Sequence, residues 1–335
     1  MTRRVIHVVR SDSFAGVERY IADTANELAA RGWATTVIGG DPVRMRGEVS
    51  GAVTLVPASS TLDVARALWQ AGPTDVIHAH MTAAELPAAV LKRRLGGRLI
   101  VTRHFAQPRG SSAASRTVAR ITRHRFDEQI AISNFVAQAI EEPSTVLWNG
   151  VRRSAATGAA RSPRVVIMQR LEPEKNTAIG VRAFAGSGLA KHGWKLDIYG
   201  VGREHEALVP LISELGIGDA ATLRGRTAKA REVLATAGIV LATAPAEPFG
   251  LTVVEAMAEA APVLASRAGA HTETLGDIGH YFGAGDVDDA AQALCALARD
   301  EGARAAYGSA LRERHAALFD LPRHVDRLEQ IYAGS

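Results

Sequence analysis

The sequence predicts an α/β protein made of two doubly wound domains, each a parallel sheet covered by helices on both faces. Short apolar strands alternate with amphipathic helices along nearly the whole chain, which is typical of such sheets. The alternation stops once, across residues 151–163, and then restarts. The 335 residues also exceed what one core usually holds, so two domains are expected.

The elements of the first domain, residues 1–152, follow from apolar periodicity and turn residues. Strands are expected at 5–9, 35–38, 53–56, 75–80, 98–104, 129–133 and 145–150. Helices are expected at 17–31, which Gly32 closes, and at 62–71, 83–95 and 113–125.

The second domain, residues 153–318, repeats the pattern. Strands are expected at 164–168, 196–199, 221–224, 239–244 and 263–266, and helices at 176–186, 204–215, 228–235, 251–258, 288–299 and 303–317. A last helix at 322–332 follows a break at Pro322. We expect this segment, residues 319–335, to cross back to the first domain.

The composition is that of an ordinary globular protein, with 47% apolar and 22% charged residues. No apolar run approaches the roughly 20 residues that cross a bilayer, and the apolar part of the N-terminus has only a strand's length, so no signal peptide is expected. The single cysteine, Cys295, excludes an intramolecular disulfide and a cysteine-based metal cluster. It fits a reducing, cytoplasmic setting and a core position rather than a nucleophile.

Positive charge is concentrated in the first half of the chain. Residues 1–150 carry 18 Lys and Arg against 13 Asp and Glu, a balance of +5, whereas the remainder carries 21 against 22, a balance of −1. Residues 86–126 hold ten basic residues and no acid. Such a block is by default a solvated surface, and the sharper hypothesis is a face that meets anionic membrane or an anionic acceptor.

The segment 247–258 carries the most informative chemistry. It follows an apolar strand, turns at Pro248 and Gly250, and continues as a helix, with Glu247 in the turn and Glu255 on the helix. A helix N-terminus attracts phosphate, and two carboxylates beside it are costly unless they face hydroxyl donors. A nucleotide sugar would supply both the phosphate and the hydroxyl donors. An equally good alternative is a helix whose acidic residues only interact favourably with its dipole.

Two cations follow the first strand of the second domain, at the strand ends where doubly wound sheets bind ligands. Arg170 and Lys175 flank a proline turn that enters a helix. They form either a diphosphate clamp or surface ion pairs with Glu172 and Glu174.

Two glycine turns lie at strand ends as well. Gly16 opens a helix after the first strand, where the backbone could approach a diphosphate, although a lone glycine is more often only a turn. Gly225 and Arg226 end a strand where the edge of a nucleobase could meet the backbone.

Histidines end two strands of the first domain. His78 and His80 close the strand 75–80, and Arg103 and His104 close the strand 98–104. We expect strand alternation to place His78 and His80 on opposite faces, so that they do not bind one metal ion together. His80 is the one nearest a ligand cleft, and a structural role is an equal alternative.

These segments together resemble the family 4 retaining glycosyltransferases, which have the GT-B fold of two Rossmann-like domains with a cleft between them. The strongest match is Glu-Pro-Phe-Gly-Leu-Thr-Val-Val-Glu-Ala-Met-Ala, in which Glu247 and Glu255 stand seven residues apart. Weaker matches, in the right order, are Asp75-Val-Ile-His-Ala-His80, Ile132-Ser-Asn134, Asn149-Gly-Val151, Arg170-Leu-Glu-Pro-Glu-Lys175, Tyr199-Gly-Val-Gly202 and Leu223-Arg-Gly225.

The resemblance implies a UDP- or GDP-sugar donor held by the second domain and a hydroxyl acceptor held by the first. By analogy Arg170 and Lys175 bind the diphosphate and Glu255 takes the ribose hydroxyls. Glu247 then orients the transferred sugar, and His80 lines the reaction centre. No metal or cofactor is required, and no specific nucleic-acid partner is expected.

The remaining donor contacts implied by the resemblance come from the backbone. They are expected at Phe249, Gly250, Leu251 and Thr252, with Gly16 approaching from the first domain and Gly225 and Arg226 near the base. Two departures stand out. The family often has Gly-Gly where this chain has Ala15-Gly16, and its Gly-Gly-x-x-Glu pattern appears here as Gly269-Ala-His-Thr-Glu273.

Three other functions compete with this interpretation. A nucleotide-sugar 2-epimerase would share the fold but transfer nothing, and the paired glutamates favour a transferase. A nucleic-acid-binding protein would use residues 86–126, which lack interleaved aromatic residues for base stacking. A dinucleotide oxidoreductase would need a full Gly-x-Gly-x-x-Gly after a strand, which the sequence does not have.

Overall fold

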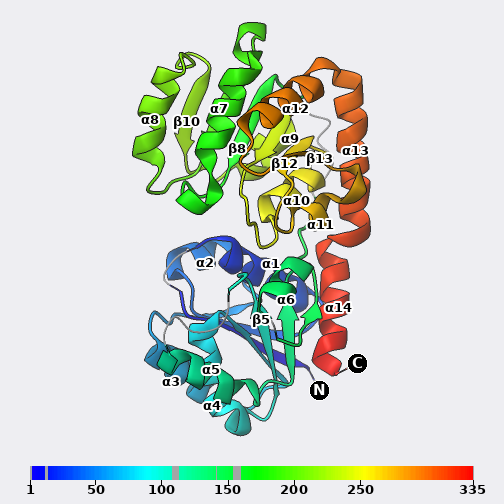
Figure 1. Ribbon diagram of the computed structural model, residues 1–335. Coiled ribbons are helices and arrows are strands. Elements are labelled where there is room, and N and C mark those ends of the chain that lie inside the picture. The colour runs from blue at the N-terminus through cyan, green and yellow to red at the C-terminus, as the bar shows by residue number, and fades with distance from the viewer. Residues whose placement is uncertain (1, 12–13, 108–112, 141, 154–159, 335) are drawn as a thin grey trace. The chain divides into compact units, whose positions relative to one another are not determined.

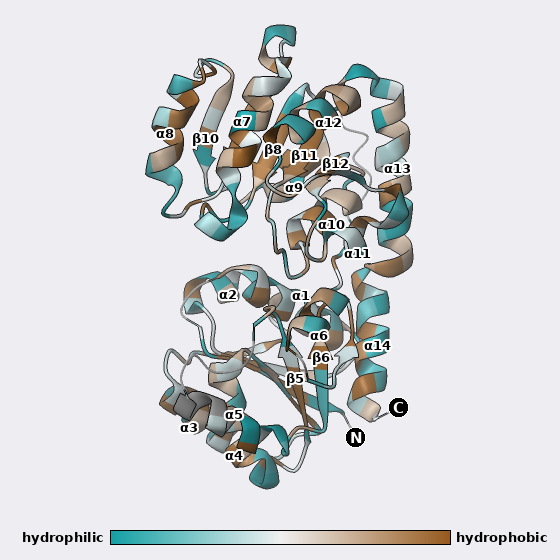
Figure 2. Cartoon of the chain, viewed as in Figure 1, coloured by the Kyte–Doolittle hydropathy of each residue, from teal (hydrophilic) through white to brown (hydrophobic). Residues whose placement is uncertain are grey.

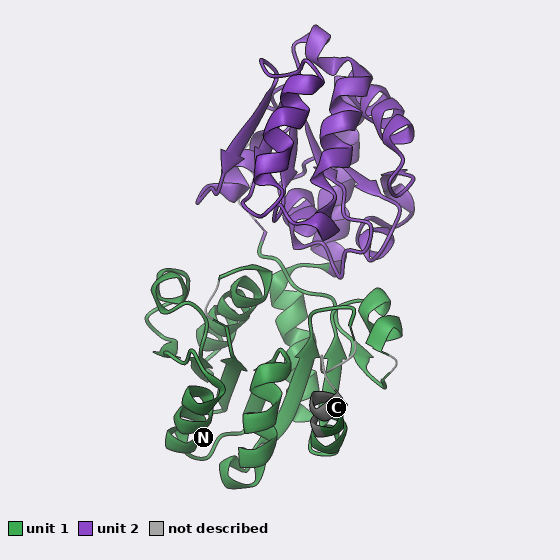
Figure 3. Cartoon of the chain, turned by 60° about the vertical axis from the view of Figure 1, so that its left-hand side comes forward, with its two compact units in different colours: residues 1–152, 319–335 green, residues 153–318 purple. Residues whose placement is uncertain are grey.

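The computed structural model describes residues 2–11, 14–107, 113–140, 142–153 and 160–334 and divides into two compact units (Figure 1, Figure 3). Unit 1 comprises residues 1–152 and 319–335, and unit 2 comprises residues 153–318. Each unit is built on one parallel sheet, so the predicted pair of doubly wound α/β units is confirmed.

Unit 1 has a seven-stranded sheet in the order β3-β2-β1-β4-β5-β6-β7. Its strands are β1 (Arg4–Val9), β2 (Ala34–Ile38), β3 (Thr54–Val56), β4 (Val76–His80), β5 (Arg98–Arg103), β6 (Glu128–Ala131) and β7 (Thr145–Val146). Its helices are α1 (Gly16–Ala30), α2 (Pro42–Glu48), α3 (Thr61–Ala71), α4 (Thr82–Leu95), α5 (Ala113–Arg123), α6 (Asn134–Ile140) and α14 (Leu321–Ala333).

Unit 2 has a six-stranded sheet in the order β10-β9-β8-β11-β12-β13. Its strands are β8 (Arg164–Met168), β9 (Lys195–Tyr199), β10 (Ala221–Gly225), β11 (Ile239–Ala242), β12 (Val263–Ser266) and β13 (His280–Phe282). Its helices are α7 (Thr177–Ser187), α8 (His205–Glu214), α9 (Ala230–Thr236), α10 (Leu251–Ala258), α11 (His271–Leu275), α12 (Val287–Arg299) and α13 (Glu301–Leu318), with 3-10 turns at Pro173–Lys175, Leu189–His192 and Gly276–Ile278.

Central strands of both sheets are buried on both faces, which explains their nearly continuous apolar sequences (Figure 2). In β1, Val5, Val8 and Val9 have no exposed surface, and in β8 Val165 and Ile167 have none. Helices carry mixed surfaces, apolar toward the sheet and polar outward (Figure 2). Among the described residues no helix is long and apolar enough to cross a membrane.

Helix α14 belongs to unit 1 although it ends the chain. Residue Asp320 forms a parallel bridge with Val151, and α14 begins one residue later, with Pro322 in its first turn. A proline fits there because the first turn of a helix needs no N–H donor. The chain therefore breaks just before Leu321, and Pro322 is a helix start rather than the break itself.

Short elements are where the structure departs most from the expected pattern. The strand expected at 145–150 forms a ladder only at Thr145–Val146. Strand β13 and helices α2, α6 and α11 were not expected, because none of them exceeds seven residues and so none shows a full period of apolar side chains.

Burial predicts how much α14 contributes to unit 1. Leu328 is fully buried in a core cluster with Val5, Val76 and Ile100 of the sheet. We expect Leu328→Ala to lower the free energy of unfolding by about 2–5 kcal/mol, measured by urea titration. The exposed neighbour Arg327 supplies the control, and Arg327→Ala should change it by less than about 0.5 kcal/mol. Equal stability of the two variants would show that α14 does not complete this core.

Candidate active site

The candidate site of unit 2 lies where its strand order reverses. Strands β8 and β11 are neighbours, but the chain leaves β8 toward β9 on one side and leaves β11 toward β12 on the other. In such sheets ligands bind beyond the carboxyl ends of the strands at this reversal. Here the loop after β8 delivers Lys175 and the loop after β11 delivers Glu247. Their side chains meet with 2.5 Å between Lys175 Nζ and Glu247 Oε2.

Hydrogen bonds to the backbone fix the loop that carries Lys175. The hydroxyl of Thr243, just after β11, donates to the Lys175 carbonyl at 2.7 Å. The amide of Gln169 donates to the same carbonyl at 3.1 Å and to the hydroxyls of Thr177 and Thr243 at 2.9 Å. Both loops are thus tied together independently of the ion pair, and the backbone at Lys175 is held in place.

The loop that carries Glu247 is held by a close backbone approach. The amide of Ala270 donates to the Glu247 carbonyl at 2.8 Å. Gly269 adopts φ +56°, and a Cβ there would lie 2.5 Å from the Glu247 amide nitrogen. Only glycine permits this contact, which explains the glycine of the Gly269-Ala-His-Thr-Glu273 segment.

Helix α10 begins beside the ion pair with an uncapped N-terminus. Gly250 is its N-cap, with φ +86°, and no side chain caps the helix. The first amides of the helix, at Leu251 and Thr252, therefore point out of the helix end, where they suit a phosphate. Glu255 lies one turn further along and is partly exposed, whereas the Phe249 side chain is 2% exposed and belongs to the core.

Arg170 and Lys175 have different ion-pair partners. The Arg170 guanidinium pairs with Glu174 at 2.6 Å, and both side chains are more than half exposed. Glu172 pairs instead with Arg203 at 2.8 Å. The alternative of surface pairing thus describes Arg170 but not Lys175. Exposed pairs of this kind contribute little to stability, so Arg170 can exchange Glu174 for an anion at small cost.

The glycine turns have different surroundings. Gly225 ends β10 with φ +67°, its carbonyl accepts from the Gly200 amide at 2.8 Å, and the neighbouring Arg226 is exposed. Gly16 is the first residue of α1 in unit 1. The carboxylate of Glu18 already accepts from the Ala15 amide at 2.9 Å at this helix start. An acid here makes the end of α1 less attractive to a phosphate than the end of α10.

His271 is a site residue that sequence reasoning noted only as an irregularity. Its Nδ1 donates to the Ser266 carbonyl at 3.1 Å, which fixes Nδ1–H and leaves Nε2 as an acceptor. A Cβ on Gly250 would lie 3.4 Å from His271 Cδ2 and 3.5 Å from Glu247 Cγ, so the ring borders the helix start. Burial lowers the pKa of His271, which Glu247 partly opposes. The sequence feature that could have identified His271 is its position in a segment where the family pattern has no histidine.

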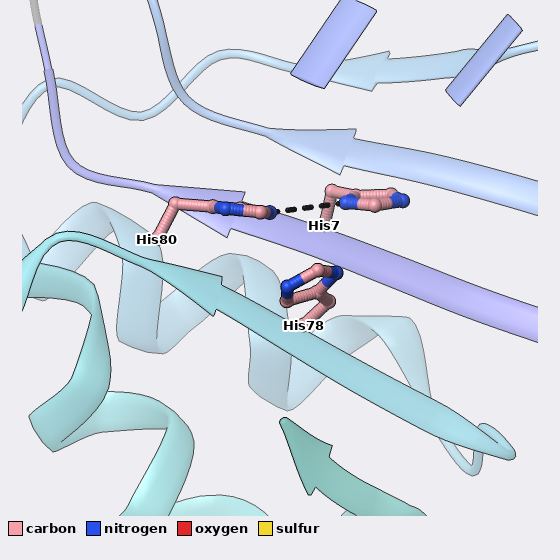
Figure 4. Close-up of side chains that lie close together, drawn as sticks. All are labelled: His7, His78 and His80. Atoms are coloured by element: carbon pink, nitrogen blue, oxygen red, sulfur yellow. Dashed lines mark hydrogen bonds between the residues drawn. The ribbon is translucent and has the colours of Figure 1, made fainter. Parts of the chain in front are cut away.

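The expected separation of His78 and His80 is wrong. Residues two apart in a strand share a face, and the two ring centroids lie only 4.1 Å apart. His7 of the neighbouring strand β1 lies beside both, and one nitrogen of each ring lies within 4.8 Å of the others (Figure 4). Opposite strand faces therefore cannot be the reason why His78 and His80 would not share a metal ion.

A larger cluster surrounds these three rings in unit 1. His104 follows β5, Tyr20 comes from α1, and His324 comes from α14. Tyr20 and His324 are hydrogen-bonded at 3.0 Å, and Tyr20 contacts His80 and His104 edge-on. His80 has no exposed surface and both its nitrogens contact other imidazoles, whereas His104 remains 6% exposed. His104 is thus nearer the surface than His80.

Comparisons with known proteins place the chain in a family. Residues 154–314 match the family described as "Glycosyl transferases group 1", and residues 14–154 match "Glycosyltransferase Family 4". The chain belongs to the family 4 glycosyltransferases. Solved structures agree with this fold: Anabaena Alr3699/HepE in complex with UDP-glucose superposes with a TM-score of 0.82 at 20% identity, covering 99% of this chain and 100% of that one. The fold is therefore GT-B.

Curated relatives match over very different lengths. A phosphatidyl-myo-inositol mannosyltransferase of Mycobacterium leprae is 28% identical over 338 residues, covering 90% of this chain and 86% of the relative. An exopolysaccharide phosphotransferase of Streptomyces coelicolor is 31% identical over 165 residues, covering 48% of this chain and 17% of the relative. The chain thus spans about a sixth of the length of that second glycan-related protein.

The histidine cluster predicts how unit 1 responds to acid. Burial lowers the pKa of His7 and His104 to about 3 and of His324 to about 4, and holds those of His78 and His80 well below the ordinary value. The unfolded chain titrates near pH 6.5 and so binds more protons below that pH. Stability is therefore present above pH 6.5 and is lost as the pH falls, by up to about 1.4 kcal/mol per pH unit and histidine.

We expect the urea midpoint of unit 1 to fall steeply between pH 7 and pH 5. The measurement is circular dichroism of the full chain in urea at half-unit pH steps. The exposed His192 supplies the control, because His192→Gln should leave this pH profile unchanged. A midpoint that is constant from pH 7 to pH 5 would contradict the neutral, buried state of the five histidines.

Proposed function

We propose that the chain transfers a sugar from a UDP- or GDP-sugar to a hydroxyl acceptor with retention of configuration at the anomeric carbon. The contact between Lys175 and Glu247, at the strand reversal of unit 2 and beside the uncapped end of α10, is the observation that carries the proposal. It joins a cation, a carboxylate and exposed helix amides, which are the groups that a sugar diphosphate needs.

In the proposed sugar transfer, the main task of the protein is to stabilise developing charge. The bond from the anomeric carbon to the β-phosphate oxygen breaks, and its electron pair stays on the nucleoside diphosphate. The acceptor oxygen bonds to the anomeric carbon, and its proton passes to the departing phosphate. The phosphate gains negative charge during this step, so Lys175, Arg170 and the α10 amides stabilise the transition state more than the bound donor.

Lys175 and Glu247 act as a unit in this proposal. Each side chain is about one-sixth exposed, so the pair is shielded but open to a ligand. The ammonium group has three N–H donors, and it can keep its bond to Glu247 while it binds a phosphate oxygen. Glu247 then has an oxygen left for a hydroxyl of the transferred sugar. Glu255, one turn along α10, accepts from the ribose hydroxyls.

The acceptor side is assigned to unit 1. His80 ends β4, His104 follows the neighbouring strand β5, and His104 is the more exposed of the two. We assign the substrate contact to His104 and a place behind it to His80. A similar structure supports a UDP-linked donor, since Alr3699/HepE was solved with UDP-glucose. The mannosyltransferase named for phosphatidyl-myo-inositol supports a lipid among the acceptor classes.

The two glutamates should separate in their effects. Glu255→Ala removes charge-assisted hydrogen bonds to the ribose, so we expect the affinity for UDP or GDP, measured by calorimetry, to fall about 10- to 100-fold. Glu247→Ala leaves the nucleotide contacts in place, so we expect turnover to fall about 100-fold with nucleotide affinity changed by less than about threefold.

A matched variant serves as the control for the comparison of Glu247→Ala with Glu255→Ala. Glu206 lies in the first turn of α8 and is exposed, so Glu206→Ala removes a helix-terminal carboxylate of the same unit to which no donor contact is assigned. It should retain wild-type binding and turnover. Equal loss of nucleotide affinity in the Glu247 and Glu255 variants would contradict the assigned roles. Radiolabel that remains on the nucleotide as an epimer, instead of moving to an acceptor, would contradict transfer itself.

The basic block 86–126 supports a second, smaller proposal, a contact with anionic membrane. Several of its cations are already engaged: Arg103 pairs with the buried Glu85 at 3.2 Å, and Lys92 pairs with Asp127 at 2.6 Å. Among its exposed cations, Arg120 and Arg123 at the end of α5 flank Ile121, whose side chain is 66% exposed. Cations beside an exposed apolar side chain suit a lipid surface.

We expect the double variant Arg120→Ala, Arg123→Ala to lose most of its co-sedimentation with phosphatidylglycerol vesicles. Each cation near an anionic surface contributes about 1 kcal/mol, so the partition coefficient should fall about 30-fold. The double variant Arg182→Ala, Arg299→Ala removes two exposed cations of unit 2 and serves as the control. Sedimentation of the wild type that is indifferent to lipid charge would refute the membrane contact.

A further inference from the structure

Three imidazoles of unit 1 form a hydrogen-bonded chain that leads from the core toward the surface. His7 Nδ1 lies 3.1 Å from His80 Nε2, and His80 Nδ1 lies 3.1 Å from His104 Nε2. Figure 4 shows the first of these contacts, with the two rings end to end and His78 beside them. His7 and His80 have no exposed surface, while His104 keeps 6%. The chain thus has an inner end and an outer end.

The protons of such a chain are linked. A neutral imidazole has one N–H and one lone pair, so each contact between two rings needs one donor and one acceptor. The tautomer of one ring therefore determines the tautomers of the other two. Either the N–H bonds point outward, from His7 through His80 to His104, or they point inward in the opposite order.

The inner end decides between these two arrangements. His7 Nε2 is buried and has no hydrogen-bond partner among the described residues. In the inward arrangement this nitrogen would carry a buried N–H without an acceptor, which folded proteins rarely tolerate. In the outward arrangement it carries only a lone pair. The outward arrangement is therefore favoured.

We propose that His7 and His80 are positioning residues that hold His104 as an Nδ1–H tautomer, so that His104 presents a hydrogen-bond donor to an oxygen of the bound substrate. This inference rests on the proposed sugar transfer for its functional meaning. His7 donates from Nδ1 to His80, His80 donates from Nδ1 to His104, and the remaining Nδ1–H of His104 is the outer donor. Among the residues that the structure describes, His7 Nε2 has no hydrogen-bond partner, so the series of hydrogen bonds begins at His7.

Neighbouring groups hold the rings without disturbing this order. His324 donates from Nδ1 to the Trp148 carbonyl at 2.8 Å, so its Nε2 accepts from the Tyr20 hydroxyl at 3.0 Å. The Tyr20 hydroxyl therefore donates its proton in the hydrogen bond to His324 and does not donate to His104. His78, whose ring is tilted by 39° against that of His80, is held by the hydroxyls of Tyr332 at 2.7 Å and Thr102 at 2.6 Å.

A metal ion is the competing use of His7, His78 and His80. Their nitrogens lie close enough, but those of His78 and His80 are already in hydrogen bonds. An ion would have to break several of these contacts at once. The hydrogen-bonded chain accounts for the same geometry without that loss, and metal binding is an outcome that the experiment detects.

The test reads the tautomers directly. The full chain is labelled with ¹⁵N-histidine, and two-bond proton–nitrogen correlation spectra distinguish Nδ1–H from Nε2–H rings. Signals are assigned with the variants His7→Asn, His80→Asn and His104→Asn. We expect Nδ1–H at His7, His80 and His104 in the wild type. Nε2–H at His80 and His104, or one retained equivalent of metal in elemental analysis, would overturn the proposal.

Activity adds the second readout. His7→Leu removes the inner donor, so the signals of His80 and His104 should become mixtures of both tautomers. We expect kcat to fall about fivefold, the rate equivalent of about 1 kcal/mol, with nucleotide affinity unchanged. His7→Asn restores an N–H near the Nδ1 position and should recover most of the rate. The exposed His192→Leu is the control. A normal rate with unmixed tautomers in His7→Leu would overturn the positioning role.

These experiments distinguish failure of the tautomer proposal from failure of the proposed sugar transfer. The tautomers are measured without substrate, so they stand or fall whether or not sugar transfer occurs. Should His7→Leu not fold, the wild-type spectrum and His7→Asn still decide the direction of the chain. Absence of any transfer in the wild type, with outward tautomers present, would refute the proposed function alone.

Discussion

The adjacency of β8 and β11 is the constraint on which the candidate site depends. Seventy-two residues separate Lys175 from Glu247 along the chain, but their loops leave two strands that are paired in the sheet. The parallel direction then brings both loops to the same edge. A cation and a carboxylate from different loops meet there without either loop being long. The sheet does the positioning, and Thr243 and Gln169 lock the result.

The two helix starts of the candidate sites differ in a way that charge explains. At α10 the N-terminus has no side-chain cap, and the carboxylate of the neighbouring Glu247 is engaged by Lys175. At α1 the Glu18 carboxylate caps the backbone of Ala15 and is 2% exposed. One helix end is therefore open to an anion and the other is closed by its own acid. This asymmetry supports the proposal that unit 2 rather than unit 1 binds the diphosphate of the donor.

Sequence patterns predicted the long elements and the strand-end residues, but not their contacts. Regular alternation located the paired sheets, because buried parallel strands are continuously apolar. It failed at short elements such as β13, which holds three residues. The separation of His78 and His80 was a misapplied periodicity, since the period of a strand is two. Surface pairing with Glu172 or Glu174 was one of two alternatives for both cations, and it describes Arg170, which pairs with Glu174. The pairing of Lys175 with Glu247 could not be predicted, because it depends on which strands are neighbours in the sheet.

The histidine cluster shows why burial and function have to be considered together. Five neutral imidazoles in one core cost stability whenever the unfolded chain can take up protons. Apolar residues of similar size would avoid that cost. The retained polar groups instead form ordered contacts, from Trp148 through His324 to Tyr20, and from His7 through His80 to His104. A core built this way trades stability for a fixed orientation at its outer end, and that end is His104, the cluster's more exposed imidazole.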